Sequence, residues 1–186
     1  AYSLINSLSS IGCHVSYQPM LEIREIERPY FLENKSILSK PLQHIIFVST
    51  NAVRFGLPHI LSGRFLLAKN ASYYAVGSAT ARLLLEAGID AIFPKDKMTS
   101  AGLLELVPFS EINGENIGLI KGEGGRDYLA VALEEQGANV IPFDCYRRVP
   151  AKINSTDLVK LIEDNNIEMA IFSSAEGMLR FISLTE

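Results

Sequence analysis

The sequence predicts an α/β protein built on parallel sheet, and three observations carry this prediction. Apolar runs of strand length alternate with segments of helical periodicity along the chain, as in parallel sheets covered by helices. Residues 117–150 read as strand, glycine loop, helix ending at Gly137 and strand ending at Pro150, which is the βαβ unit of a parallel sheet. Two segments of the chain also recur at a fixed offset, which indicates two related halves.

Each element has its own local signal. Strands are expected where apolar residues run for a few positions before a turn; these segments are 15–17, 21–28, 45–48, 73–76, 91–93, 117–120, 140–143 and 169–172. Helices are expected where apolar residues recur at helical spacing; they lie around 4–11, before 39, and around 52–55, 83–84, 103–107, 129–133, 158–162 and 178–181. The predicted helix ends are glycines and the predicted N-caps are hydroxyl residues; they are Gly12, Gly88 and Gly137, and Ser49 or Thr50, Thr99 with Ser100, Ser155 and Ser174.

The repeat has an offset of 125 positions, the distance from Leu4 to Leu129 and from Ser49 to Ser174. It relates residues 4–15 to 129–140 and residues 46–53 to 171–178. Coincidence between common helix–glycine–strand patterns is the alternative, but the shared register of two separate segments favours duplication. On this register we expect residues 1–186 to lack the first strand and the last strand–helix units of one half.

Two candidate linkers occupy matching places in the repeat, near 20–30 and 143–153. A chain of 186 residues can form one ordinary domain or two small ones. If the chain crosses between the halves at both linkers, the domains are as follows: a first lobe of 1–22 plus 153–186, a linker of 23–40 and 143–152, and a second lobe of 41–142. The sequence pattern leaves this crossing open.

Composition excludes several classes of protein. The net charge of −4 argues against a general nucleic-acid binder, which needs clustered Lys and Arg. No apolar run approaches the roughly 20 residues of a membrane span, and no signal-peptide pattern opens the sequence. Cys13 and Cys145 lie far apart without a CxxC motif, so we expect buried thiols and a cytoplasmic protein. The three histidines, His14, His44 and His59, lack metal-ligand spacing, so we expect structural or surface roles and no metal.

Candidate binding residues gather where predicted strands meet predicted helices. Five such junctions carry small or hydroxyl residues: Ser49-Thr50-Asn51, Gly77-Ser78-Ala79-Thr80, Thr99-Ser100, Gly122-Glu123-Gly124-Gly125 and Ser173-Ser174. In a parallel sheet these junctions meet at the carboxyl edge, where ligands bind, and helix N-termini there suit anions. Plain capping explains any single junction. Five together favour a ligand with several carboxylates or phosphates.

Two further side chains carry candidate chemistry. Arg126 opens a helix, where a cation opposes the helix dipole, so it either pairs with an anion or a carboxylate partner or is an ordinary exposed arginine. Tyr146 follows a strand directly, and a neutral phenol can donate a proton at pH 7; the alternative is a packing tyrosine with a satisfied hydroxyl. Gly122-x-Gly124 continues to Asp127 rather than to a third glycine, so the dinucleotide fingerprint fails. No P-loop and no GxSxG motif occurs.

Together the motifs resemble the uroporphyrinogen-III synthase family over nearly the whole chain. The matching segments are 46–53 (IFVSTNAV), 75–81 (AVGSATA), 121–126 (KGEGGR), 146–150 (YRRVP) and 172–174 (FSS). Each segment is weak alone, whereas their order and spacing are specific. The family's opening strand with a Thr-Arg-Pro turn and its closing strand–Gly–Thr unit have no counterpart here.

The resemblance implies two small flavodoxin-like lobes joined by a two-stranded linker, with the substrate in the cleft between them. It implies a cofactor-independent lyase that dehydrates the linear tetrapyrrole hydroxymethylbilane and closes it, with ring D inverted, to uroporphyrinogen III. Tyr146 matches the candidate proton donor, Thr80 a cleft hydroxyl, and Ser49 and Ser174 the duplicated serines. We expect a monomer that binds neither nucleic acid nor membrane.

Two rival functions stay open at this point. A two-lobed binding or sensor module for a small polyanion would share the capped junctions but would not need Tyr146. A doubly wound glycosyl- or phosphoryl-transfer enzyme would want a carboxylate or metal site at the cleft, and none is evident in the sequence.

Overall fold

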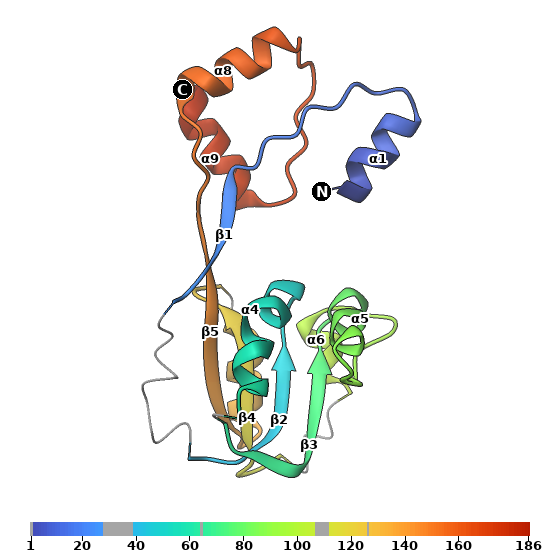
Figure 1. Cartoon of the computed structure of the whole chain (residues 1–186), viewed down its shortest axis with the longest axis vertical. Coiled ribbons are helices and arrows are strands. Elements are labelled where there is room, and N and C mark those ends of the chain that lie inside the picture. Colours follow the sequence, from blue (N-terminus) through green and yellow to red (C-terminus); the bar gives the residue numbers. More distant parts are fainter. Residues whose placement is uncertain (1, 28–38, 64, 107–111, 126) are drawn as a thin grey trace. The chain divides into compact units, whose positions relative to one another are not determined.

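The computed structural model describes residues 2–27, 39–63, 65–106, 112–125 and 127–186, and the chain divides into two compact units (Figure 1). Unit 1 comprises Ala1–Glu22 and Val149–Glu186, and unit 2 comprises Ile23–Arg148. The chain passes between the units inside two strands, β1 (Leu21–Glu25) and β5 (Asn139–Pro150). The predicted α/β class is confirmed.

One five-stranded sheet organises unit 2, in the order β1-β5-β4-β2-β3. Its other strands are β2 (Leu42–Phe47), β3 (Leu67–Ala75) and β4 (Asn116–Gly122). The pairs β2–β3, β2–β4 and β4–β5 are all parallel, as predicted. The segment predicted at 91–93 makes a single parallel bridge, between Ile92 and Tyr74, rather than a full strand.

Helices cover both faces of this sheet. They are α4 (Thr50–Leu61), α5 (Ser78–Glu86), α6 (Ser100–Leu104) and α7 (Tyr128–Glu135). Successive side chains of a strand point to opposite faces, so Ile45 and Phe47 join one core with α4 and α5, whereas Ile46 joins the other with α6 and α7. Unit 2 is therefore doubly wound, with a separate apolar core on each side of the sheet.

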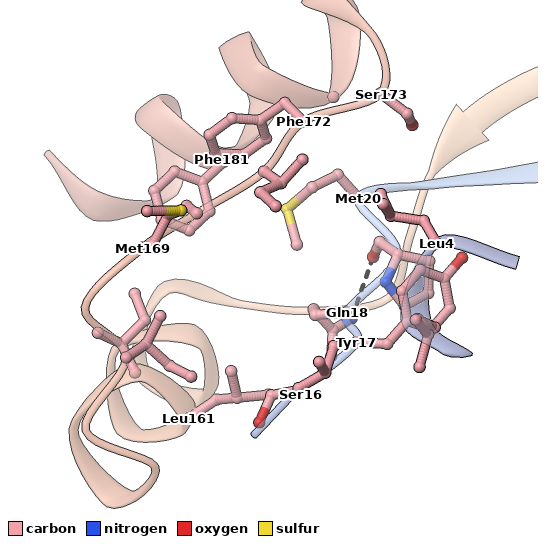
Figure 2. Close-up of a pocket in the computed structure, with 18 of the residues that line it drawn as sticks. Leu4, Ser16, Tyr17, Gln18, Met20, Leu161, Met169, Phe172, Ser173 and Phe181 are labelled. Carbon is pink, nitrogen blue, oxygen red and sulfur yellow. Dashed lines mark hydrogen bonds between the residues drawn. The ribbon is translucent and has the colours of Figure 1, made fainter. Parts of the chain in front are cut away.

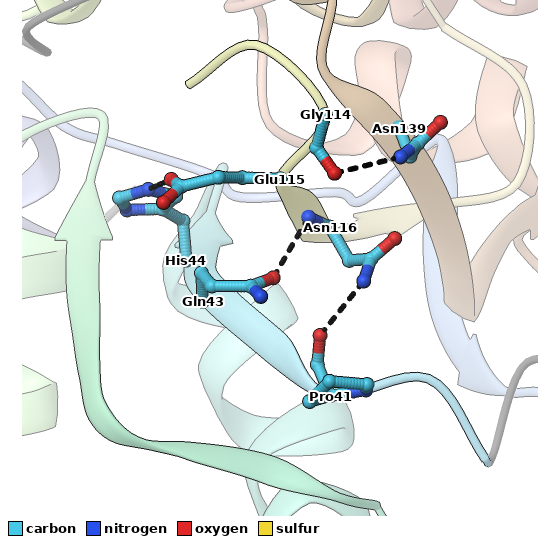
Figure 3. A network of polar contacts seen from close by, with 7 residues as sticks. All are labelled: Pro41, Gln43, His44, Gly114, Glu115, Asn116 and Asn139. Carbon is cyan, nitrogen blue, oxygen red and sulfur yellow. Dashed lines mark hydrogen bonds and ion pairs between the residues drawn. The ribbon is translucent and has the colours of Figure 1, made fainter. Parts of the chain in front are cut away.

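Side chains fix the strand starts at the amino edge of the sheet (Figure 3). The Asn116 backbone N–H donates to Gln43 Oε1 at 2.8 Å, and the Asn116 side-chain amide donates to the Pro41 carbonyl at 3.0 Å. His44 Nε2 pairs with Glu115 Oε2 beside them. These contacts tie β2 to β4 in one register, and His44 has the structural role expected of it.

The described residues of unit 1 form three helices: α1 (Tyr2–Ser10), α8 (Ser155–Asp164) and α9 (Ala175–Thr185). The strands predicted at 15–17 and 169–172 are wrong, because both segments are irregular. In unit 2 the repeated segments 46–53 and 129–140 include residues of β2 and β5, and these two strands pair with opposite edges of β4. Their counterparts in unit 1 have no strand between them in the described part of that unit. A strand is stabilised only by neighbours that take up its backbone hydrogen bonds.

Several smaller predictions are resolved as well. Ser49 and Ser174 cap α4 and α9 as expected. The cap of α8 is Asn154 instead of Ser155, because the amide oxygen of Asn154 accepts the Asp157 N–H at 2.8 Å. Cys145 is buried as expected, but Cys13 is exposed, since it follows α1 in a stretch that no strand covers. The helix predicted before residue 39 and the end of the helix predicted at Val107 lie outside the described residues.

Candidate active site at the switch point of unit 2

The strand order reverses between β2 and β4, which is where a doubly wound sheet is expected to form a crevice. From β2 the chain proceeds outward to β3 and Ile92, and then returns to β4 on the other side of β2 before reaching β5. The helices that follow β2 and β4 belong to the cores on opposite faces of the sheet. At such a switch point the two loops diverge beyond the carboxyl ends of the strands, and doubly wound proteins bind ligands there.

The loop after β2 carries Ser49, the N-cap of α4. Its backbone is extended (φ −162°, ψ 167°), which turns the hydroxyl back over the first turn of the helix. Ser49 Oγ accepts the Ala52 N–H at 3.1 Å, so one otherwise unpaired amide of the helix terminus is satisfied. The same oxygen lies 3.0 Å from the phenol oxygen of Tyr146.

Tyr146 reaches Ser49 from two strands away. It lies on β5 opposite Gly122 of β4, and β4 separates β5 from β2. A Cβ added at Gly122 would lie 2.5 Å from Cε2 and 2.6 Å from Cζ of the tyrosine, so the ring crosses β4 where that strand has no side chain. Phe55 flanks the ring at a centroid distance of 6.0 Å, and Tyr146 is only 6% exposed.

The glycine loop follows β4 at the same switch point. Gly124 and Gly125 have φ of 68° and 99°, a left-handed backbone that favours glycine at both positions. The loop is anchored to β5, because the Glu123 N–H donates to the Tyr146 carbonyl at 2.7 Å. The Glu123 carboxylate also pairs with Arg147 at 3.3 Å. The predicted site residue Arg126 lies outside the described residues.

Charged side chains near the loop form an ion pair and shift the pKa of a neighbouring carboxyl. Lys121 Nζ pairs with Asp127 at 2.9 Å, and Lys121 is also the register partner of Asp144 on β5. Burial raises the pKa of the Asp144 carboxyl; Lys121 opposes this shift, and Glu123 adds to it. The neighbouring Cys145 thiol has its pKa raised to about 12 by burial, so it is a neutral thiol and not a nucleophile.

The other predicted site residues are distributed more widely. Gly77, Ser78 and Thr80 follow β3 at the same carboxyl edge; the exposed Ser78 hydroxyl donates to the Met98 sulfur at 3.3 Å, whereas Thr80 is 5% exposed, on the inner face of α5. Thr50 and Asn51 occupy the first turn of α4 behind Ser49, and both are partly buried. The structure thus brings Ser49, Gly122 and Tyr146 together.

Ser173 and Ser174 belong to unit 1, where both are exposed and Ser174 Oγ accepts the Gly177 N–H at 3.1 Å. They precede α9 beside a hollow of about 710 Å³ (Figure 2). Leu4, Tyr17, Met20 and the edge-to-face pair Phe172–Phe181 line much of it, so its surface is largely apolar.

The described ranges contain no cluster of three His, Cys, Asp or Glu side chains that would hold a metal ion. Within the same ranges, no helix has the length and apolar character needed to cross a membrane. The contact between Ser49 and Tyr146 was not foreseen from the sequence. The available signal was that Ser49, Gly122 and Tyr146 all lie at the ends of parallel strands, which meet at one edge of a sheet.

Comparison with known proteins identifies the family. The family model described as uroporphyrinogen-III synthase HemD matches residues 3–186. The uroporphyrinogen-III synthase of Proteus mirabilis is 29% identical over 147 residues, which cover 78% of this chain and 74% of that protein. The Escherichia coli enzyme of the same name is 23% identical over 184 residues, 97% of this chain and 74% of the relative.

Solved structures agree with this result at the level of the fold. A crystal structure of a mutant uroporphyrinogen III synthase from Thermus thermophilus superposes with a TM-score of 0.62 at 22% identity, over 87% of this chain and 62% of that one. The Helicobacter pylori enzyme superposes with a TM-score of 0.57 at 18% identity, over 90% of this chain and 70% of that one. The predicted function, a lyase of haem biosynthesis that forms uroporphyrinogen III, is confirmed at the level of the family by the names of the relatives. The chain belongs to the uroporphyrinogen-III synthase family.

Proposed function

We propose that this chain converts hydroxymethylbilane into uroporphyrinogen III, with Tyr146 as the source of the proton that the departing hydroxyl needs. The observation that carries this assignment is the 3.0 Å contact between the Tyr146 and Ser49 hydroxyls at the switch point of unit 2. A buried phenol hydroxyl needs a hydrogen-bond partner, and here that partner is the serine that caps the helix after β2. A proton donor must be held within hydrogen-bond reach of the groups that react.

The reaction needs little more than positioning and one proton transfer. Protonation of the hydroxyl lets it leave as water, and the remaining cation is an azafulvene. Attack by the substituted carbon of ring D gives a spiro intermediate, which fragments and closes as the inverted isomer. Without protein the free carbon attacks and gives isomer I. The main task of the protein is therefore to hold one carbon, and not its neighbour, within reach.

We propose that the substrate carboxylates meet helix N-termini and loop amides rather than a basic patch. This explains how a chain with a net charge of −4 binds a polyanion. The proposed binding residues are Ser49, Thr50, Asn51, Gly77, Ser78, Thr80, Gly122, Gly124, Gly125, Arg126, Ser173 and Ser174. Two of them require an indirect role, because Thr80 is buried and Gly122 lies under the Tyr146 ring.

The finer architecture is also a proposal. We infer two similar lobes, built on units 1 and 2, with β1 and β5 as the linker. Support comes from the doubly wound sheet of unit 2 and from the 125-residue repeat. Unit 2 is flavodoxin-like in its layers rather than in its strand order, because its first strand, β2, lies beside β4 and not beside the segment at Ile92. We further propose a cytoplasmic monomer that needs no cofactor and binds no nucleic acid.

The test is incubation with hydroxymethylbilane followed by chromatographic separation of isomers III and I. We expect the chain to give isomer III and Tyr146→Phe to lower turnover by about 10²-fold or more, the contribution typical of a general acid. The loss of one hydrogen bond should cost only about 1 kcal/mol of folding stability. Tyr73→Phe, which removes a half-buried phenol hydroxyl from β3, is the control.

Wild-type rates of isomer III formation by Tyr146→Phe would show that the tyrosine is not the acid. If the chain binds the substrate tightly but releases only isomer I at the uncatalysed rate, it is a binding module for polyanions and the proposed activity is wrong.

A further inference from the structure

Two hydroxyls at the switch point share one hydrogen bond, but they do not share the same surroundings. The Tyr146 phenol lies against Gly122 and Phe55 and is almost completely buried, whereas Ser49 is only partly buried at the end of β2. Ser49 is therefore the more exposed residue of the pair.

Counting donors and acceptors fixes the direction of the shared bond. A serine hydroxyl has one hydrogen and two lone pairs, and Ser49 Oγ already accepts the Ala52 N–H. If Tyr146 donates to Ser49, both lone pairs are used and the serine hydrogen is free to point outward. If Ser49 donates instead, the phenol hydrogen is left in the buried pocket, and an unsatisfied buried donor carries the full cost of its desolvation.

We propose that Ser49 donates the proton directly to the substrate and that Tyr146 is the positioning residue that directs the serine hydroxyl and replaces its proton. This inference rests on the proposed function. It reassigns the roles in the pair, because the tyrosine acts through the serine. The chain of donors runs from the buried phenol on β5 to the cap of α4 and outward to the crevice.

Every proton transferred in one turnover is accounted for. The carbon–oxygen bond of the hydroxymethyl group breaks with its electron pair going to oxygen, which takes the Ser49 proton and leaves as water. The Tyr146 proton moves to Ser49 at the same time. The cationic tetrapyrrole loses one proton when the macrocycle closes, and this proton returns through Ser49 to the phenol oxygen. No oxidant, reductant or further reactant is needed.

The test compares Ser49 variants with Tyr146→Phe in the full chain, using hydroxymethylbilane as the probe. We expect Ser49→Ala to lower kcat at least as much as Tyr146→Phe, with KM changed by less than about threefold. The double variant should be no slower than Ser49→Ala alone, because groups acting in series are not additive. Ser49→Thr keeps both the hydroxyl and the cap and should recover most of the rate. Asn154→Ala removes the cap of α8 outside the site and should leave the rate unchanged.

Three outcomes separate the possibilities. If Ser49→Ala retains most of the wild-type rate while Tyr146→Phe is slow, the phenol acts directly and the inference is wrong, although the proposed function stands. If the wild-type chain forms no isomer III, the proposed function fails, and the serine's role fails with it. The hydrogen bond has its own readout: the two substitutions should be coupled by about fivefold in the unfolding equilibrium constant, and additive effects would contradict the contact.

Discussion

Gly122→Ala tests the geometry of the site without removing any group that reacts. The new Cβ would lie 2.5 and 2.6 Å from two carbons of the Tyr146 ring, whereas carbon atoms in contact are ordinarily about 3.5 Å apart or more. The ring must therefore shift by about 1 Å. A shift of that size suffices to break a hydrogen bond that is 3.0 Å long.

Two costs add in this variant. Overpacking of a buried site costs about 1–3 kcal/mol, and the lost hydrogen bond adds about 0.5–1.5 kcal/mol. We expect urea denaturation to show a loss of about 1.5–4.5 kcal/mol in the free energy of unfolding. We expect the rate of isomer III formation to fall toward that of Tyr146→Phe, because the phenol no longer meets Ser49.

Gly77→Ala is the matched control for stability. Gly77 also lies at the carboxyl edge, as the N-cap of α5 after β3, but a Cβ there would lie 3.5 Å from Met98 Cβ, an ordinary contact. The steric reasoning has its own check, because Tyr146→Ala removes the ring and should abolish most of the cost of Gly122→Ala. If Gly122→Ala lowers the free energy of unfolding equally in the wild-type and Tyr146→Ala proteins, the tyrosine ring does not cross β4 at this glycine.

Two further predictions concern titratable groups on β5. Burial raises the folded-state pKa of Asp144 above its ordinary value of 3.8. The ionised carboxylate therefore destabilises the folded state at pH values above the folded-state pKa. Below the unfolded-state pKa the group is protonated in both states and has no effect on stability. Asp144→Asn should therefore raise the free energy of unfolding at pH 7 with little effect near pH 3, and the opposite trend in urea titrations would contradict this. Iodoacetamide should label Cys13 but not Cys145 in the folded chain; mass spectrometry that finds both thiols labelled without denaturant would show that Cys145 is accessible.

Local signals in the sequence predicted local structure well. Ser49 and Ser174 each cap a helix through an amide three residues ahead. Gly12 and Gly137 end helices with φ of 88° and 86°. These features depend on neighbours within one turn of chain, so the residues that decide them are all visible in a short window.

Contacts that depend on strand order were not predictable in the same way. Whether 15–17 and 169–172 become strands depends on a partner strand between them, which their own residues do not reveal. The meeting of Ser49 and Tyr146 needs β2, β4 and β5 in that spatial order and a glycine on the middle strand. The repeat and the parallel topology indicated the shared edge, but the strand order and the side-chain contacts came from the structure.

The sparse interior of unit 1 affects how the whole chain unfolds. Among its described residues, the buried apolar side chains are Met20, Ala151 and Leu158, whereas the other buried apolar residues belong to unit 2. A region with so little buried surface opens at a lower free energy than a region with two full cores. Melting of residues 1–186 should therefore not be a single two-state transition, and amide exchange in α1, α8 and α9 should precede exchange in β2 and β4.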